Sequence, residues 1–151
     1  ASSIKRGDCL HILIHASLDF KDLMIAAKEY IEDNSCHTVI LPELTRYQDI
    51  RDKDGDDITF TKIKNRLTKD NFSNVEKCDL LYILNPSHRG IENYVGGNAF
   101  MEMVIAYYLN KPIYLLNPIP EKMSYTEEMK TFYPIITHNF HDFLKLLGTH
   151  S

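Results

Sequence analysis

One carboxylate in the second half of the chain stands out for its surroundings. Glu102 is the only charged residue between Asn93 and Lys111. On a helix, its neighbours four residues away in each direction are Asn98 and Ala106, so it lies on a narrow small or polar strip of an otherwise apolar surface. A carboxylate held there is partly desolvated and can act as a nucleophile toward an electrophilic sugar carbon or as a general base. The alternative is that Glu102 only favours the positive end of the helix dipole.

Two glycines directly precede this helix. Gly96 and Gly97 would permit positive φ and a close approach of a ligand to the backbone, next to a helix N-terminus that can hold a phosphate group. The alternative is a tight loop that simply needs flexible residues. The chain contains neither a GxGxxG pattern nor a P-loop pattern, so a dinucleotide or nucleoside-triphosphate site of those kinds is not expected.

Four further side chains are candidates for ligand contacts, each with a structural alternative. His15 ends the first strand-like run and can face a ligand, although a hydrogen-bonded histidine at a strand end is the favoured interpretation. Tyr94 can contact a sugar or stack on a base, or it can pack on the core as a lid. His88 and Arg89 can bind a phosphate, or they can belong to a solvated loop.

The histidine and cysteine spacing predicts neither a metal site nor a redox pair. His138 and His141 are three residues apart, but no third ligand lies nearby, so we interpret them as surface residues. Cys9, Cys36 and Cys78 are odd in number and widely spaced, without a CxxC pattern. We therefore expect three reduced core thiols in a cytoplasmic protein, and neither a metal nor another cofactor.

The composition of the chain matches an ordinary globular domain. Its 151 residues, 44% of them hydrophobic and 25% charged, fit one domain over 1–151 and exclude disorder for most of the length. A net charge of −4 argues against a dedicated nucleic-acid or anionic-membrane binder. No apolar run approaches the roughly 20 residues of a membrane span, and the N-terminus lacks the apolar segment of a signal peptide. We therefore expect a cytoplasmic protein with neither nucleic-acid nor membrane partners.

Apolar runs of strand length alternate with longer stretches at helical spacing. Strands are predicted at residues 10–15, 38–41, 79–84, 112–116 and 135–136. Helices are predicted from an N-cap at Asp19 to residue 31, irregularly over 58–75, and over 98–110, 126–131 and 140–147. The polar segment 43–57 is the one candidate for a mobile loop.

This alternation predicts an α/β fold, with a five-stranded parallel sheet covered by helices on both faces. In a sheet of strand order 2-1-3-4-5, ligands bind beyond the carboxyl ends of the strands, where the order reverses between strands one and three. Residues 15–19 and 85–102 lie at that point. If this topology is right, the side chains of Ser17, Asn85 and Glu102 converge on one crevice.

The segment from Cys78 to Pro118 carries a family resemblance. It contains Cys78-Asp79, Asn85, the run Tyr94-Val-Gly-Gly-Asn-Ala-Phe-Met-Glu102, Ala106 and the run Lys111-Pro-Ile-Tyr-Leu-Leu116. Together with the opening strand 10–16, Ser17 and residues 39–42, these residues resemble the nucleoside 2-deoxyribosyltransferase-like superfamily, which includes nucleotide N-glycosidases. The resemblance implies a flavodoxin-like fold and cleavage or exchange of the N-glycosidic bond of a nucleoside or nucleotide. It also implies that Glu102 is the catalytic glutamate, since Glu102 and Ala106 match the family pattern.

The resemblance further implies which residues hold the substrate. The first loop of the family lines the sugar or phosphate pocket, which assigns Ser17, and the alternative for Ser17 is an ST-turn or a helix cap. The loop after the third strand and the start of the next helix add Asn85, His88, Tyr94, Gly96, Gly97 and Asn98. Tyr107, Tyr108 and Tyr114 are interpreted as core and interface residues rather than as a stacking platform. Homologous folds assemble through helices such as the one predicted over 98–110, so a homodimer or higher homo-oligomer is expected.

Several departures mark this chain as a distinct branch. Val104 stands where the family has a glycine two residues after the catalytic glutamate, and Gly97-Asn98 replaces a Gly-Ser or Gly-Thr pair. The acid just before that glycine is absent, and the family's second acid corresponds in register to Asn71 rather than to Asp70. In relatives these positions contact the base or handle protons. The departures support an alternative, a non-catalytic nucleotide-binding module on the same fold.

Overall fold

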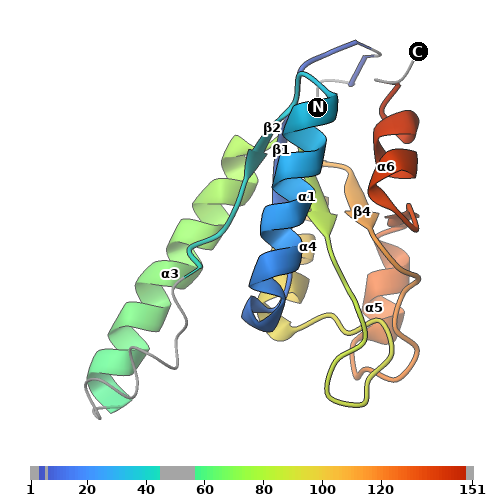
Figure 1. The fold of residues 1–151 in the computed structure, drawn as a ribbon. Coiled ribbons are helices and arrows are strands. Elements are labelled where there is room, and N and C mark those ends of the chain that lie inside the picture. The colour runs from blue at the N-terminus through green and yellow to red at the C-terminus, as the bar shows by residue number, and fades with distance from the viewer. Residues whose placement is uncertain (1–3, 6, 45–56, 149–151) are drawn as a thin grey trace.

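The structure of the protein, a computed structural model, is built on five parallel strands (Figure 1). It describes residues 4–5, 7–44 and 57–148, and of residues 57–60 only the backbone. The strands are β1 (His11–His15), β2 (Thr38–Ile40), β3 (Leu80–Ile83), β4 (Ile113–Leu115) and β5 (Ile135–Ile136). Their order is β2-β1-β3-β4-β5, and every pairing among them is parallel. The predicted fold class, an α/β flavodoxin-like fold of order 2-1-3-4-5, is confirmed.

Helices cover both faces of the sheet. The helices are α1 (Lys21–Asn34) and α6 (Phe140–Leu146) on one face, and α3 (Asp57–Lys77), α4 (Gly97–Tyr108) and α5 (Thr126–Thr131) on the other. The four side chains of β3 are all buried, because this strand lies inside the sheet and is covered on both sides. Alternation along β1 sends Ile12 and Ile14 into the core beside α1, and Leu13 into the core beside α4.

The connection from β1 to α1 differs from the prediction. A short 3₁₀ helix, η1 (Leu18–Phe20), comes first, and α1 begins at Lys21 without a side-chain cap. The N–H of Phe20 donates to the carbonyl of Ser17 at 2.8 Å, and this tight turn separates Asp19 from the start of α1. The predicted N-cap at Asp19 is therefore wrong. Asp19 instead lies exposed in η1, with its carboxylate 3.1 Å from Nε2 of His88.

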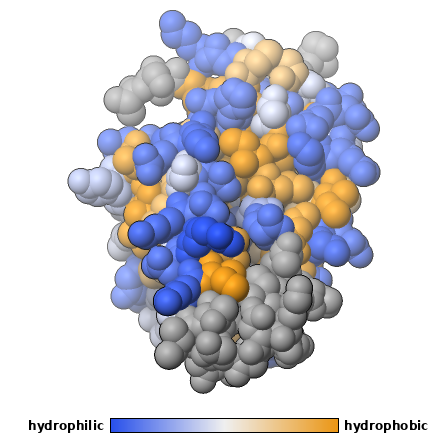
Figure 2. Space-filling view, turned by 90° about the vertical axis from the view of Figure 1, so that its left-hand side faces the viewer, coloured by the Kyte–Doolittle hydropathy of each residue, from blue (hydrophilic) through white to orange (hydrophobic). Residues whose placement is uncertain are grey.

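The longest helix is α3, with 21 residues. The expected irregular stretch over 58–75 is corrected to one continuous helix. Its apolar residues are sparse because one side packs on the core, at Val75, while Lys62, Arg66 and Lys69 are exposed. Figure 2 views the molecule from the side of α3, where hydrophilic residues cover most of the surface and apolar residues gather near the centre. The predicted mobile loop, 43–57, lies outside the described residues from 45 to 56.

None of the helices in the described ranges is both long enough and apolar enough to cross a membrane.

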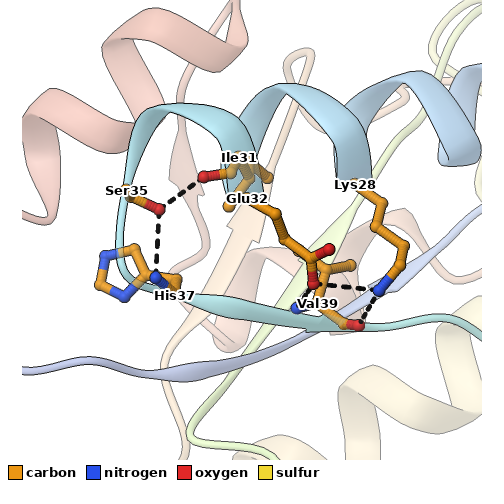
Figure 3. A network of polar contacts seen from close by, with 6 residues as sticks. All are labelled: Lys28, Ile31, Glu32, Ser35, His37 and Val39. Carbon is orange, nitrogen blue, oxygen red and sulfur yellow. Dashed lines mark hydrogen bonds and ion pairs between the residues drawn. The ribbon is translucent and has the colours of Figure 1, made fainter.

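Side chains of α1 satisfy the free edge of β2 (Figure 3). The N–H of Thr38 donates to Leu10 of the neighbouring chain segment, so the N–H and C=O of Val39 point away from the sheet. Glu32 Oε2 accepts from the N–H of Val39 at 2.8 Å, and Lys28 Nζ donates to the carbonyl of Val39 at 2.9 Å. Glu32 and Lys28 also pair at 3.0 Å. The two side chains replace the backbone groups of a further strand, which hinders pairing of this edge with another chain.

Two of the three cysteines form a disulfide, which corrects the expectation of three reduced core thiols. Cys9 and Cys36 are bonded, with Cα atoms 5.3 Å apart, and both are exposed. The strand register explains this pairing, because β1 and β2 align His11 with Thr38 and each cysteine lies two residues before its strand. Cys78 is a free, buried thiol, and burial raises its pKa to about 11.

Candidate functional site

A cavity of about 350 Å³ opens at the carboxyl end of β1. Its wall combines the loop after β1, the segment after β2, part of α3, the loop after β3 and the first turn of α4. The lining residues are His15, Ala16, Ser17, Leu18, Asp19, Pro42, Glu43, Leu67, Asn71, Arg89, Tyr94, Gly96, Gly97, Asn98 and Ala99. This is the point between β1 and β3 where the strand order reverses, which is where the topology places a ligand.

The structure brings most of the residues proposed from the sequence to this cavity. The ones in its lining are Ser17, Tyr94, Gly96, Gly97 and Asn98. Glu102 is buried beside the cavity rather than on the outer face of α4, but it is not part of the lining. Asn85 and His88 are also outside the lining, and each has a different contact, described below.

The two glycines act through shape and not through positive φ. Gly96 is the N-cap of α4 with φ of −73°, and neither Gly96 nor Gly97 has a positive φ, so that expectation is wrong. A Cβ atom on Gly96 would lie 3.4 Å from the hydroxyl oxygen of Tyr94, so glycine allows this ring to approach the start of the helix. A Cβ atom on Gly97 would meet nothing within 4 Å. Gly97 therefore keeps space open at the cavity wall.

The first turn of α4 forms part of the cavity wall. The first N–H groups of an α-helix have no intrahelical acceptor, and the helix dipole adds partial positive charge there. In α4 these groups belong to Gly97, Asn98 and Ala99, which all line the cavity. The wall is therefore suited to a hydroxyl or phosphate group of a ligand.

Glu102 is packed against His15. The side chain of Glu102 is 1% exposed, and its Oε2 contacts Nδ1 of His15, whose side chain is 8% exposed. Neither oxygen of Glu102 accepts a hydrogen bond from a described residue. A buried carboxylate without donors is costly, so such a group in a folded protein calls for an explanation.

His15 connects Glu102 to the cavity. Alternation along β1 places His15 on the same face as Leu13, which is the face that α4 covers. The imidazole ring lines the cavity and also touches Glu102. Because Nδ1 faces Glu102, Nε2 on the other side of the ring is the nitrogen that a ligand can reach. An imidazole with a carboxylate at one nitrogen and a ligand at the other is suited to proton transfer.

The rim of the cavity is held by a contact between η1 and the loop after β3. Asp19 Oδ2 lies 3.1 Å from Nε2 of His88 and 3.9 Å from Nη2 of Arg89. The ring of His88 also packs between Phe20 and Tyr94, with centroid distances of 5.2 Å to each. His88 therefore supports the rim from behind, and Asp19 offsets part of the positive charge at Arg89.

Arg89 has an uncommon backbone conformation. Its φ is 52° and that of Gly90 is 75°, in a tight turn that His88 and Ile91 close with two backbone hydrogen bonds of 2.9 Å. The left-handed region is sparsely occupied by residues other than glycine, and a residue held there often belongs to a functional site. The turn places Arg89 at the mouth of the cavity.

Asn85 joins two loops instead of facing the cavity. Its Nδ2 donates to the carbonyls of Asn117 at 3.0 Å and Pro118 at 3.2 Å, and its Oδ1 accepts from the N–H of Asn117 at 2.8 Å. The side chain is fully buried, and its amide is used to hold the loop after β3 against the loop after β4. Asn85 therefore lies outside the cavity lining, and its amide has a structural role.

His15, Arg89 and Asn71 also line the cavity, although none of the three is among the residues assigned to the catalysis or to the substrate from the sequence. For His15 the missed signal is strand alternation, since Leu13 and His15 share a face. For Asn71, which is 8% exposed, the signal is its position four residues before Val75 on the core-facing side of α3. Both signals become specific only when the covering helix of each face is known.

Groups with strongly shifted pKa lie away from the cavity. Burial lowers the pKa of His37, whose Nδ1 accepts from the N–H of Leu10 at 2.9 Å. Burial also raises the pKa of Tyr82, whose hydroxyl pairs with Thr137 at 2.6 Å. In the part of the chain that the structure describes, no group of three or more His, Cys, Asp or Glu side chains could hold a metal ion.

No protein-family model matches the chain, and no curated protein matches it in sequence. The fold and the cavity define a class of protein, an α/β domain of flavodoxin-like topology with a cavity at the switch point of its sheet. The activity is inferred from the side chains at that cavity.

Proposed function

We propose that the protein cleaves or exchanges the N-glycosidic bond of a (deoxy)nucleoside or nucleotide. The observation that carries this proposal is the carboxylate of Glu102, which is 1% exposed, lacks hydrogen-bond donors among the described residues and touches the cavity-lining His15. Breaking a glycosidic bond leaves positive charge on the anomeric carbon of the sugar. A carboxylate in a desolvated site stabilises that charge or attacks the carbon. The glutamate singled out by the family resemblance thus has the burial and the setting that this chemistry requires.

The lining of the cavity suits a molecule of nucleoside size. Its volume of about 350 Å³ falls in the usual range of small-molecule sites, roughly 300 to 1,000 Å³. Ser17 and Asn98 offer polar groups to a sugar, and the ring of Tyr94 offers a face on which a base can stack. Gly97 leaves room for the ligand next to the N–H groups of α4.

The proposed substrate class includes both nucleosides and nucleotides, because the cavity lining contains groups that attract a phosphate and groups that repel it. Arg89 and the start of α4 favour a phosphate group, whereas the carboxylates of Asp19 and Glu43 in the same lining repel it. The acceptor is water in a hydrolase and a second base in a transferase. Comparison of each nucleoside with its 5′-monophosphate, with and without a free base, distinguishes these cases.

A non-catalytic nucleotide-binding module is the second candidate function. It is favoured by the position of Glu102, which is not in the cavity lining and contacts the lining residue His15. Val104 and Asn71, which depart from the family pattern, support the same alternative. A module of this kind binds the ligand and leaves the glycosidic bond intact.

Release of free base separates the two candidates. The protein is incubated with the common deoxynucleosides, ribonucleosides and their 5′-monophosphates, the products are separated by chromatography, and binding is measured in parallel by calorimetry. We expect free base from at least one member of the panel. Binding without base release would contradict the enzymatic proposal and support the module.

We infer that the protein forms a homodimer or higher homo-oligomer through the outer face of α4. The exposed apolar side chains of that helix are Met101, Val104, Tyr107 and Tyr108, with exposures from 38% to 81%. Glu102, the one charged residue of α4, is buried, so nothing charged on this helix opposes association. A helix that is apolar on all sides is normally covered. In sedimentation, the wild type should be an oligomer and Val104→Asp a monomer, and a monomeric wild type would contradict the inference.

A cytoplasmic location remains part of the proposal, but the cysteines no longer support it. Disulfides such as Cys9–Cys36 persist mainly in oxidising compartments. In a reducing compartment the same two residues would stay adjacent as thiols. Alkylation of thiols at the moment of cell lysis, followed by mass spectrometry, tests this, since a cytoplasmic protein should carry label on both Cys9 and Cys36.

A further inference from the structure

We propose that His15 is a catalytic residue of this site and transfers a proton through Nε2 to the nitrogen of the departing base. The inference rests on the proposed function and deepens it. It defines the substrates as nucleosides or nucleotides whose base leaves only when it takes up a proton. It also gives Glu102 a second task, which is to hold the imidazole ring of His15.

The placement of the ring carries the first part of this inference. His15 ends β1, lines the cavity and is nine-tenths buried. Its Nδ1 faces a carboxylate that has no other partner among the described residues. Because the carboxylate lies against Nδ1, Nε2 is the ring nitrogen left on the side of the cavity.

The other titratable side chains of the lining are less suited to donate a proton. The guanidinium of Arg89 does not give up its proton in proteins. Asp19 is paired with His88 at the rim, and Glu43 is exposed. An imidazole is the side-chain type best suited to give and take a proton near neutral pH. Among the described lining residues, His15 is therefore the best proton donor.

Asn71, on α3, also lines the cavity. A carboxamide can form hydrogen bonds with a base but cannot transfer a proton. The proton is therefore assigned to His15 and not to Asn71.

The step is balanced in atoms and electrons. The bond between C1′ and the base nitrogen breaks, its electron pair goes to that nitrogen, and the nitrogen takes the proton from Nε2 of the protonated His15. Water then adds its oxygen to C1′ and returns a proton to Nε2, so that nucleoside and water give free base and free sugar. When a second base replaces water, its N–H supplies the returning proton and the bases are exchanged.

The pair of Glu102 and His15 couples this proton to the charge on the sugar. Before the step, the carboxylate and the imidazolium compensate each other. Once the proton has left, the charge of Glu102 is uncompensated at the moment when the sugar becomes positive. Because the pair is buried, that charge acts in a low-dielectric setting and is little screened. This coupling accounts for a buried carboxylate whose one close partner is a titratable ring.

The test compares leaving groups that need a proton with leaving groups that do not. The first class is the natural nucleoside that the wild type cleaves fastest. The second class is 7-methyl-2′-deoxyguanosine and 4-nitrophenyl 2-deoxyriboside, whose leaving groups depart without protonation. In His15→Gln we expect kcat/KM to fall at least about a hundredfold for the natural substrate, the scale of general acid catalysis, and about threefold or less for the second class.

Two controls keep the outcome interpretable. His11→Gln changes the same residue type at the opposite, exposed end of β1 and should leave both classes unchanged. If His15→Gln has a lowered thermal midpoint, His15→Gly is assayed with added imidazole, which should restore cleavage of the natural substrate. Equal losses for both substrate classes, or full activity of His15→Gln on the natural substrate, would overturn the role of His15 and leave the proposed function standing. Absence of base release by the wild type would overturn both.

Discussion

At the scale of single residues, the site depends on where one strand ends and one helix begins. The strand β1 ends at His15 and the helix α4 begins at Gly97, so both residues lie at the carboxyl edge of the sheet. Glu102 lies further along α4, beneath His15, where the sheet and the helix exclude water from its carboxylate. Gly97 therefore provides an open wall, His15 provides an imidazole ring at the cavity, and Glu102 provides a buried charge.

Gly97→Ala tests the open wall. The new methyl group meets no atom of the protein and replaces glycine at a helical position, so the free energy of unfolding should rise by a few tenths to about 1 kcal/mol. The same methyl group occupies space at the cavity wall, so KM should rise by about fivefold or more, the effect of roughly 1 kcal/mol of lost fit. Denaturant unfolding and steady-state kinetics check the two parts. An unchanged KM would show that the substrate does not approach this wall.

Much of the site could be predicted from the sequence, because it follows from topology and from the chemistry of single residues. Ser17, Tyr94 and Gly97 line the cavity, as expected for the loop after the first strand and the loop after the third. Asn85 was assigned to the substrate because it sits at the end of a strand, but its amide binds the next loop, a tertiary contact that no local pattern encodes. His15 was undervalued because its partner, Glu102, is distant in the sequence.

At the scale of elements, the edge strand β2 is stabilised from α1. Glu32 and Lys28 satisfy the outward N–H and C=O of Val39, which otherwise face no further strand (Figure 3). The hydrogen bond from the N–H of Val39, together with Lys28, holds the pKa of Glu32 below its ordinary value of 4.5. A carboxyl group with a lowered pKa stabilises the fold above that ordinary value, and this contribution is lost as the pH falls through the lowered pKa.

Glu32→Gln should therefore show a destabilisation that depends on pH. Because the Glu32 side chain is one-third exposed, we expect a loss of roughly 0.5 to 1 kcal/mol at pH 7. The difference from the wild type should shrink as the pH falls below 4.5 and the wild-type carboxyl group takes up its proton. Urea unfolding at several pH values measures it, with Glu29→Gln, an exposed position of the same helix, as the control. A difference that stays constant with pH would contradict the role of the charge.

The strands and most helices can be predicted from the spacing of apolar residues alone. The register between strands and the residues that cap the helices cannot. Buried runs such as 80–83 predict a central parallel strand because no polar residue interrupts them. The polar composition of α3 weakened the helical pattern, although the structure has a continuous helix there. The disulfide was missed because it depends on the register of β1 against β2, which becomes visible only after His11 is aligned with Thr38.

At the scale of the whole molecule, the sheet separates two ends with different tasks. The cavity lies at the carboxyl end of β1, and the Cys9–Cys36 bond lies before the amino ends of β1 and β2. The disulfide joins the chain before the first strand to the chain between α1 and β2. It therefore restrains the unfolded chain at the end opposite the site.

Reduction of this disulfide should lower stability without affecting the site. Closing a loop of sequence separation 27 is worth about 3 to 4 kcal/mol in the chain-entropy description. The thermal midpoint should fall when a reductant is added, and Cys36→Ser should show the lower midpoint with or without reductant. Cys78→Ser serves as the control for thiol chemistry elsewhere, since its midpoint should still respond to reductant. If the thermal midpoint of the wild type does not change when reductant is added, the presence of the disulfide is contradicted. If reduction greatly lowers the rate of base release, the independence of the site from the disulfide is contradicted.

The most direct test of the proposed function is the activity of Glu102→Gln, compared with Glu121→Gln, a change of the same kind at an exposed position. The variant keeps the size of the side chain and removes the negative charge that a cationic transition state requires. We predict that base release falls at least about a hundredfold, the scale of losing one principal electrostatic group. Substrate affinity should change little, because the lost interaction strengthens mainly in the transition state. The free energy of unfolding should fall, since the variant leaves buried His15 without its charged partner. Base release near the wild-type rate would contradict the assignment of Glu102 to the chemistry.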